Sequence, residues 1–273
     1  MTLVMDAATA AKLAKLNTCF YASQADSFSS TRRASWAGWD AALDAAQLQE
    51  APHSILDVAC GNMRFAAFAA RRFAGAAISK IAYTGIDNCP ALAQGARVGF
   101  EPDDSVSCQA AAVETTFIQR DIVACLLDDM PLELPAAQLV VCSGFMHHVP
   151  GAAARVRLLS QLLGAIEPDG VLVVSFWQFM TDPSIAASAR ELTAPTLVSL
   201  GLTLDDVESG DYILGWQNKP DAKRYCHSFT CQEVEDLVAA ALEEQDASFE
   251  TCLFAADGKN GKLNIYLVAR RSR

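Results

Sequence analysis

The sequence predicts an α/β fold: a mostly parallel sheet of seven strands, helices on both of its faces, and an antiparallel hairpin at the C-terminal end. Three observations predict it. Residues 54–65 contain an apolar strand, a tight turn and the start of a helix. Apolar runs of strand length then alternate with helical stretches as far as residue 177. Finally, residues 249–256 and 263–270 flank a turn and are expected to form the hairpin.

Length and charge set limits on function. The chain has 273 residues, enough for one domain with a substantial core. Its formal net charge of −11 counts against a large phosphate-contacting surface, although a local basic patch stays compatible with it. No apolar run approaches the ~18 residues that a membrane-spanning helix needs. Asp6 precedes the first basic residue, so we expect neither a signal peptide nor membrane association.

The nine cysteines are odd in number and scattered, and several lie in apolar strand-like runs. This pattern is typical of reduced core residues in a cytoplasmic protein. The pair Cys226-His227 with the nearby Cys231 resembles a zinc motif, but it lacks a C-x-x-C partner. We therefore expect no metal site.

The chain is expected to be a single domain, residues 1–273, that begins with a helical cap over residues 1–50. Residues 1–21 and 39–49 have helical composition. Between them, residues 28–39 gather two arginines and two tryptophans without a clean period. This segment is either an irregular cover over the sheet or a cover over a ligand site, in which an arginine holds an anion.

Residues 51–177 are expected to form the ligand-binding core. Residues 171–176 are continuously apolar, as in a parallel strand covered on both faces. Helices are expected at 65–78 and 152–166. The other strands are expected at 55–58, 82–87, 115–119 and 138–143.

Three acids end the first three strands of this core: Asp57, Asp87 and Asp121. In open parallel sheets, ligands bind outside the carboxyl ends of the strands. Asp87, followed by Asn88, is placed to accept hydrogen bonds from the two hydroxyls of a ribose. Asp121 could accept from an adenine amine while Ile122 packs on the ring. NAD enzymes have an acid at the same position, the end of the second strand, so Asp87 alone does not identify the cofactor.

The fourth strand ends at Ser143 and is followed by His147-His148. Its end is expected beside the first strand, at the point where the strand order reverses. His147 is therefore a candidate catalytic base. A loop histidine that only orders the end of the strand fits the same sequence.

Residues 178–228 are interrupted by prolines and glycines, with a short helix expected at 197–204. A connection of this length is unusual unless it is functional, so we expect a substrate lid. Residues 229–273 then hold a C-terminal helix and the hairpin. The capping box Thr230-Cys231-Gln232-Glu233 opens that helix.

The turn after the first strand resembles the D-x-G-x-G-x-G motif of class I S-adenosylmethionine (SAM)-dependent methyltransferases. Asp57 and Gly61 match the motif, whereas Ala59 and Met63 replace glycines. The resemblance implies a Rossmann-like class I methyltransferase fold with SAM as the cofactor. By that resemblance, the SAM-binding residues are Asp57, Ala59, Cys60 and Gly61 for the methionine part, Asp87 and Asn88 for the ribose, Asp121 and Ile122 for adenine, and Ser143 for the pocket floor.

A narrower resemblance is to the eukaryotic tRNA wobble-uridine carboxymethyl methyltransferases. The matching elements are Phe20-Tyr21, Phe28-Ser29-x-Thr31-Arg32-x-x-x-Trp36, Cys60-Gly61-Asn62-x-Arg64-Phe65, His147-His148 and Arg224-Tyr225-Cys226-His227-Ser228-Phe229. This family implies a carboxylate acceptor on a modified tRNA uridine. It also implies that Arg33, Arg224 and His227 converge on the acceptor.

SAM carries an activated methyl group, so a methyltransferase mainly aligns donor and acceptor. A carboxylate acceptor needs no base, whereas a hydroxyl acceptor would use His147. Arg33, Arg64 and Arg224 are candidates to bind a carboxylate, because the guanidinium fork binds it bidentately; Arg64 could equally be a surface residue. Two alternatives remain open: a small-molecule methyltransferase, which the acidic charge favours, and a catalytically silent binding protein of the same fold.

Overall fold

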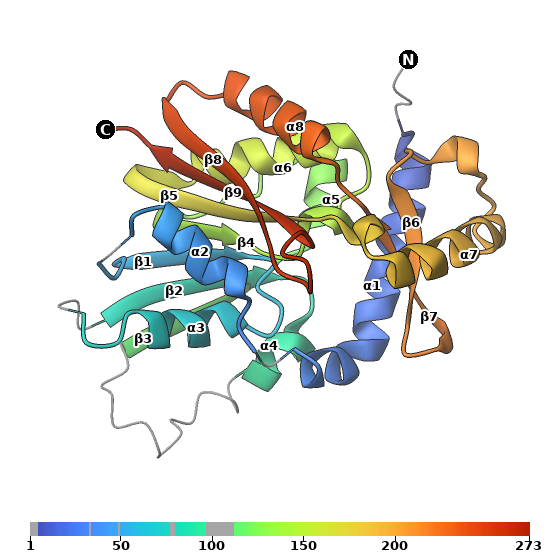
Figure 1. Cartoon of the computed structure of the whole chain (residues 1–273), viewed down its shortest axis with the longest axis horizontal. Coiled ribbons are helices and arrows are strands. Elements are labelled where there is room, and N and C mark those ends of the chain that lie inside the picture. The colour runs from blue at the N-terminus through green and yellow to red at the C-terminus, as the bar shows by residue number, and fades with distance from the viewer. Residues whose placement is uncertain (1–4, 33, 49, 77–79, 97–111) are drawn as a thin grey trace.

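A seven-stranded sheet with the order β3-β2-β1-β4-β5-β9-β8 organises the protein (Figure 1). The computed structural model describes residues 5–32, 34–48, 50–76, 80–96 and 112–273. The strands are β1 Ser54–Val58, β2 Lys80–Asp87, β3 Ala112–Gln119, β4 Ala137–Cys142, β5 Ile166–Trp177, β8 Phe249–Ala256 and β9 Asn264–Arg271. The first five run parallel, and β9 is antiparallel to both β5 and β8. The predicted α/β sheet with its C-terminal hairpin is confirmed.

Helices cover both faces of the sheet (Figure 1). On one face lie α2 Ala37–Ala45 and α3 Arg64–Arg72, and on the other lie α5 Ile122–Leu127, α6 Ala152–Gly164 and α8 Cys231–Glu243. The short α4, Pro90–Ala96, follows β2. Successive side chains of a strand point to opposite faces, so Leu56 packs in the layer of α6 and α8 while Ile55 packs in that of α2 and α3. Full burial of such a side chain stabilises the fold by about 1.5–3 kcal/mol.

The N-terminal helix α1, Ala7–Ser30, is longer than the sequence predicted. Asp6 caps it by accepting hydrogen bonds from the backbone of Ala8 and Thr9. The helix extends past residue 21 because no proline or glycine follows until residue 38. The expectation of irregular structure from residue 28 is therefore wrong for its first residues.

The insertion between residues 178 and 228 is ordered by a helix and a hairpin. The helix α7 spans Pro183–Ser199, so the short helix expected at 197–204 is wrong. Asp182 caps α7, and Pro183 stands in its first turn, where a missing N–H costs nothing. The short 3-10 helices η2 Phe179–Thr181 and η3 Leu204–Asp206 flank α7.

The strands β6 Asp211–Trp216 and β7 Lys219–His227 form a separate antiparallel pair. Gln217 and Asn218 join them, both with positive φ (50° and 56°), as in the two-residue turns that fit the twist of a hairpin. β7 packs along α1, and the two lie side by side at one end of the sheet (Figure 1). Among the described residues, no helix is both long and apolar enough to cross a bilayer.

Candidate functional site

A cavity of about 710 Å³ opens where β1, β2 and β4 end. One part of its wall comes from these strand ends, with Asp57, Asp87 and Ser143. The facing part comes from the N-terminal cap and the β6–β7 hairpin, with Trp216 and Arg224. The site therefore joins the sheet to a segment that precedes it in sequence and to a hairpin inserted between β5 and β8.

The turn between β1 and α3 has an unusual backbone. Ala59, Gly61 and Met63 all have a left-handed conformation, with φ of 61°, 51° and 52°. These are the three positions at which the resembled motif has glycines, and only Gly61 adopts this conformation without steric cost. The turn thus keeps the glycine-type path despite two substitutions.

Met63 does not line this cavity. It is 4 % exposed and packs in the layer of α2 and α3. Its methyl group lies against Gly85 of β2, where an added Cβ would come within 2.9 Å of Met63 Cε and 2.8 Å of Cys60 Sγ. Gly85 therefore makes room for the side chain that replaces a motif glycine.

Asp87 ties two backbone segments together. Its Oδ2 accepts a hydrogen bond of 2.9 Å from the backbone N–H of Gly61, and its Oδ1 accepts one of 2.9 Å from Cys89. Burial raises the pKa of Asp87, against the effect of these backbone bonds. Because each carboxylate oxygen has two lone pairs, both keep capacity for a ligand hydroxyl.

Asp57 is 3 % exposed and lines the cavity. The hydroxyl of Tyr83, a buried residue of β2, donates a short hydrogen bond to its Oδ2. Burial raises the pKa of Asp57 to about 7. A carboxyl whose pKa lies well above its usual range therefore lines the cavity.

Ser143, Asn88 and the turn residues Ala59, Cys60 and Gly61 also line the cavity, at the predicted edge of the sheet. Ser143 accepts a hydrogen bond of 3.0 Å from the indole N–H of Trp39. This bond joins the end of β4 to the helical cap.

Asp121 and Ile122 are not among the residues that line the cavity. The Asp121 carboxylate caps α5 by accepting from the backbone of Ala124 at 3.0 Å, and it also accepts from Asn88 Nδ2 at 3.4 Å. Ile122 is 3 % exposed and belongs to the core. Capping and packing engage both side chains, and the adenine contact expected of this pair stays a prediction.

Arg224 is a buried cation that makes no ion pair with the described residues. It is 5 % exposed, and its Nη1 has no hydrogen-bond partner among the described residues. Its guanidinium lies over the rings of Phe20 and Trp216, at 5.0 and 5.3 Å from their centroids. Aromatic faces stabilise a desolvated cation by up to about 2 kcal/mol, less than full pairing with an anion.

Two further arginines line the cavity. Arg32 lies 3.8 Å from the ring centroid of Phe28, and burial lowers its pKa to about 10, still well above neutral. Arg64 donates to the backbone carbonyl of Ala34 at 3.0 Å. Sequence reasoning did not select Arg32, although it stands in the quoted signature. Arg33, which was selected, lies outside the described residues.

His227 does not line the cavity, and the reason is strand geometry. Residues three apart in a strand point to opposite faces, so His227 faces away from the side of Arg224. Its Nδ1 lies 2.6 Å from Asp211 Oδ1 and its Nε2 lies 2.7 Å from Glu233 Oε1. The predicted convergence of His227 on the acceptor is wrong, because the segment is a strand rather than a loop.

His147 lines the cavity but is a poor base. It is 7 % exposed, and its Nδ1 has no partner among the described residues. Burial lowers its pKa well below the usual range, and neighbouring His148 and Arg224 lower it further. A protonated ring here would add a third cation beside Arg224 and Arg32, so the ring stays neutral.

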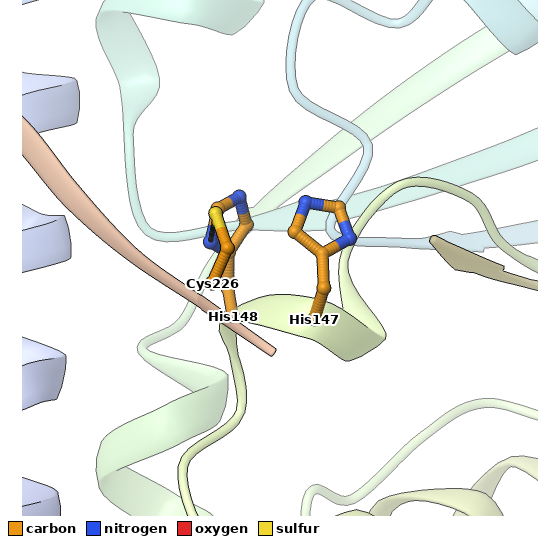
Figure 2. A group of neighbouring side chains, drawn as sticks. All are labelled: His147, His148 and Cys226. Carbon is orange, nitrogen blue, oxygen red and sulfur yellow. Dashed lines mark hydrogen bonds between the residues drawn. The ribbon is translucent and has the colours of Figure 1, made fainter. Parts of the chain in front are cut away.

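His147, His148 and Cys226 lie side by side, with ligand-type atoms within 4.8 Å of one another (Figure 2). Their surroundings do not suit a metal ion. His148 already bonds Tyr21 Oη at 2.8 Å through Nε2 and the carbonyl of Tyr225 at 3.0 Å through Nδ1. Burial raises the pKa of Cys226 to about 11, so its thiol is protonated at neutral pH.

A second group, Glu208, Asp211 and His227, has comparable spacing. Arg155 supplies the positive charge there, with a short ion pair to Glu208. Tyr225 Oη also donates to Asp211 at 2.7 Å. The donor atoms are thus saturated by protein groups.

No family model matches the sequence, and no curated protein does. Solved structures do match. A SAM-dependent methyltransferase from Methanosarcina mazei superposes with a TM-score of 0.55 at 15% identity, over 84% of this chain and 96% of that one. One from Clostridium acetobutylicum gives 0.54 at 6% identity, over 88% and 93%. At these identities the likeness concerns the fold.

Proposed function

We propose that this protein is a SAM-dependent methyltransferase that binds SAM at the carboxyl ends of β1 and β2. The turn after β1 carries the proposal. It has three left-handed residues at the motif positions, and Asp87 accepts a hydrogen bond from the backbone of Gly61 within it. The turn borders the point where the strand order reverses between β1 and β4, which is where open α/β sheets bind ligands. The methyltransferases that share this fold support the same reading.

The residues of the cavity fit the parts of SAM. The backbone of residues 59–61 and the Asp57 carboxyl would hold the methionine part, whose ammonium favours an acid. Asp87 and Asn88 would hold the ribose. SAM supplies a methyl group that is already activated on a sulfonium, so the protein has only to bind, orient and exclude water.

The acceptor is proposed to be a carboxylate. Burying a guanidinium without an ion pair costs several kcal/mol. The rings of Phe20 and Trp216 offset only part of this cost for Arg224, and a bound anion would offset more. Arg32 lines the same part of the cavity. A carboxylate is ionised at neutral pH, so no residue has to remove a proton from it. This agrees with a neutral His147 that is a weak base.

The carboxylate could belong to a modified tRNA uridine, as the sequence resemblance implies, or to a small molecule. The net charge of −11 opposes a polyanion, and Arg224 is nearly inaccessible from outside. Both observations favour the small-molecule acceptor.

Calorimetry with SAM and S-adenosylhomocysteine tests the class of protein. Binding of either at micromolar to millimolar concentration supports a methyltransferase, and its absence favours a silent protein of the same fold. The acceptor is tested with SAM that carries a tritiated methyl group, incubated with tRNA or with the small-molecule fraction of a cell extract. A methyl ester releases tritiated methanol in base, whereas methylated hydroxyls and amines do not. The fraction that yields volatile label identifies the acceptor class.

A further inference from the structure

Asp57 differs from the other cavity acids in its hydrogen bonds. Asp87 accepts two backbone N–H bonds, and Asp257 accepts from Gly38 N, Asn264 Nδ2 and Tyr266 Oη at 2.9, 2.9 and 2.6 Å. Among the described residues, Asp57 has one donor, the neutral hydroxyl of Tyr83, and no cation within ion-pair distance. Its charged form is therefore the least supported of the three.

The surroundings of Asp57 oppose its charge from several elements. Tyr83 of β2 is 1 % exposed, and the thiols of Cys60 in the turn and Cys142 of β4 are buried and uncharged. Asp87, at the end of β2, repels a second negative charge, whereas Arg64 of α3 is a nearby cation that favours the charged carboxylate. A carboxyl desolvated in this way favours its neutral form.

We propose that SAM binding at Asp57 and Tyr83 is coupled to release of a proton. Asp57 is partly protonated in the free protein and loses its proton when the cationic cofactor binds. The inference rests on the proposed function, because it requires SAM at this cavity. SAM brings an ammonium and a sulfonium, and either cation near Asp57 favours the carboxylate. Tyr83 acts as a positioning residue that holds the ionised oxygen, and it does not touch the cofactor.

Two measurable consequences follow. If the ionised form alone binds, the apparent affinity is scaled by the ionised fraction, so binding at pH 6 is roughly tenfold weaker than at pH 8. At pH 7, binding releases about half a proton from Asp57. The amino group of SAM itself titrates near pH 7.7–8.0. The Asp57→Asn variant therefore supplies the baseline that must be subtracted.

The Tyr83→Phe variant tests whether Tyr83 positions the Asp57 carboxylate for binding or only contributes to stability. The Tyr83 hydroxyl is the one hydrogen-bond donor to Asp57 in the part of the chain that the structure describes. Its loss raises the pKa of Asp57, so the pH profile of binding moves to higher pH and more proton is released at pH 7. Tyr225→Phe is the matched control. It removes an equally buried tyrosine-to-aspartate bond, from Tyr225 to Asp211, on the face of β7 away from the cavity. It is expected to lower stability without moving the binding profile.

The experiment is calorimetric titration of the full-length protein with SAM, from pH 6.0 to 8.0, in PIPES and in imidazole buffer. The difference in heat between the buffers gives the protons released. Wild type is expected to release about half a proton more than Asp57→Asn at pH 7, and Tyr83→Phe more than wild type. Binding with equal proton release in wild type and Asp57→Asn overturns the inference and leaves the methyltransferase proposal intact. Absence of SAM binding in wild type overturns both.

Discussion

The backbone N–H of Gly61 donates a hydrogen bond of 2.9 Å to Oδ2 of Asp87, so the acid that ends β2 holds the turn that follows β1. The two strands are neighbours in the sheet, which places the ends of both within reach of a single carboxylate. One side chain therefore shapes the turn and also faces the cavity. Loss of the Asp87 carboxylate should therefore lower both the stability of the fold and the affinity for a ligand in the cavity.

Asp87→Ala is expected to weaken SAM binding by roughly 1–3 kcal/mol, the scale for losing hydrogen bonds to a charged group. It should also destabilise the fold, because the N–H groups of Gly61 and Cys89 lose their acceptor. Calorimetry and urea denaturation measure the two effects. Asp87→Asn keeps one acceptor oxygen, so its stability and its affinity for SAM should lie between those of wild type and Asp87→Ala. An unchanged affinity in a folded Asp87→Ala protein would place the ribose elsewhere.

Ala59→Gly is expected to raise the free energy of unfolding by about 0.5–1 kcal/mol. Relief of the left-handed alanine gains about 1–2 kcal/mol, and the greater freedom of glycine in the unfolded chain cancels part of it. Ala67→Gly in α3 is the control and should lower stability by about 1 kcal/mol, because its backbone is helical. A less stable Ala59→Gly protein would contradict the strain argument.

Arg224→Met is expected to abolish methyl ester formation while SAM affinity changes by less than about twofold, since Arg224 lines the cavity and is proposed to hold the acceptor rather than the donor. The label released in base measures the first effect, and calorimetry the second. Arg157→Met, which removes an exposed ion pair with Asp129, is the control. Full ester formation by Arg224→Met would show that the anion binds elsewhere.

His227 should make stability depend on pH. Burial alone would lower its pKa, but the bonds to Asp211 and Glu233 outweigh burial and raise it. Stabilisation by the charged ring is therefore complete below the unfolded pKa of about 6.5 and is lost as pH rises through the folded pKa. Urea denaturation of wild type and His227→Gln from pH 6.5 upward isolates the effect, because the other groups that titrate in this range, Asp57 among them, contribute equally to both proteins. Parallel pH profiles for the two proteins would refute it.

Much of the core could be predicted, because β4 and β5 contain apolar runs and acids stand at or near the ends of β1, β2 and β3. The conformation of the turn was harder to foresee, since Ala59 and Met63 hide the glycine pattern that the backbone follows. The room for Met63 comes from Gly85 on a different strand, which is a tertiary effect that local sequence does not reveal.

The acceptor side was predicted less well. The turn of the β6–β7 hairpin has Gln217-Asn218 rather than a glycine pair, so the strands were not recognised. Because β7 was not recognised as a strand, the rule that successive side chains point to opposite faces was not applied to Arg224 and His227. Arg224 was nevertheless identified from its motif, and the structure places it at the cavity.

The amide of Tyr225 in β7 donates to Asn17 Oδ1 of α1 at 2.7 Å, across 208 residues of sequence. During synthesis, α1 leaves the ribosome long before the strand that completes its buried face. The face of α1 that packs against β7 therefore has no β7 to contact until about four-fifths of the chain has been made. Closure of so long a loop is slow compared with local folding. The side of the cavity that carries Arg224 is thus assembled late, and a chain cut short before residue 225 would carry the ends of β1, β2 and β4 without the strand that bears Arg224.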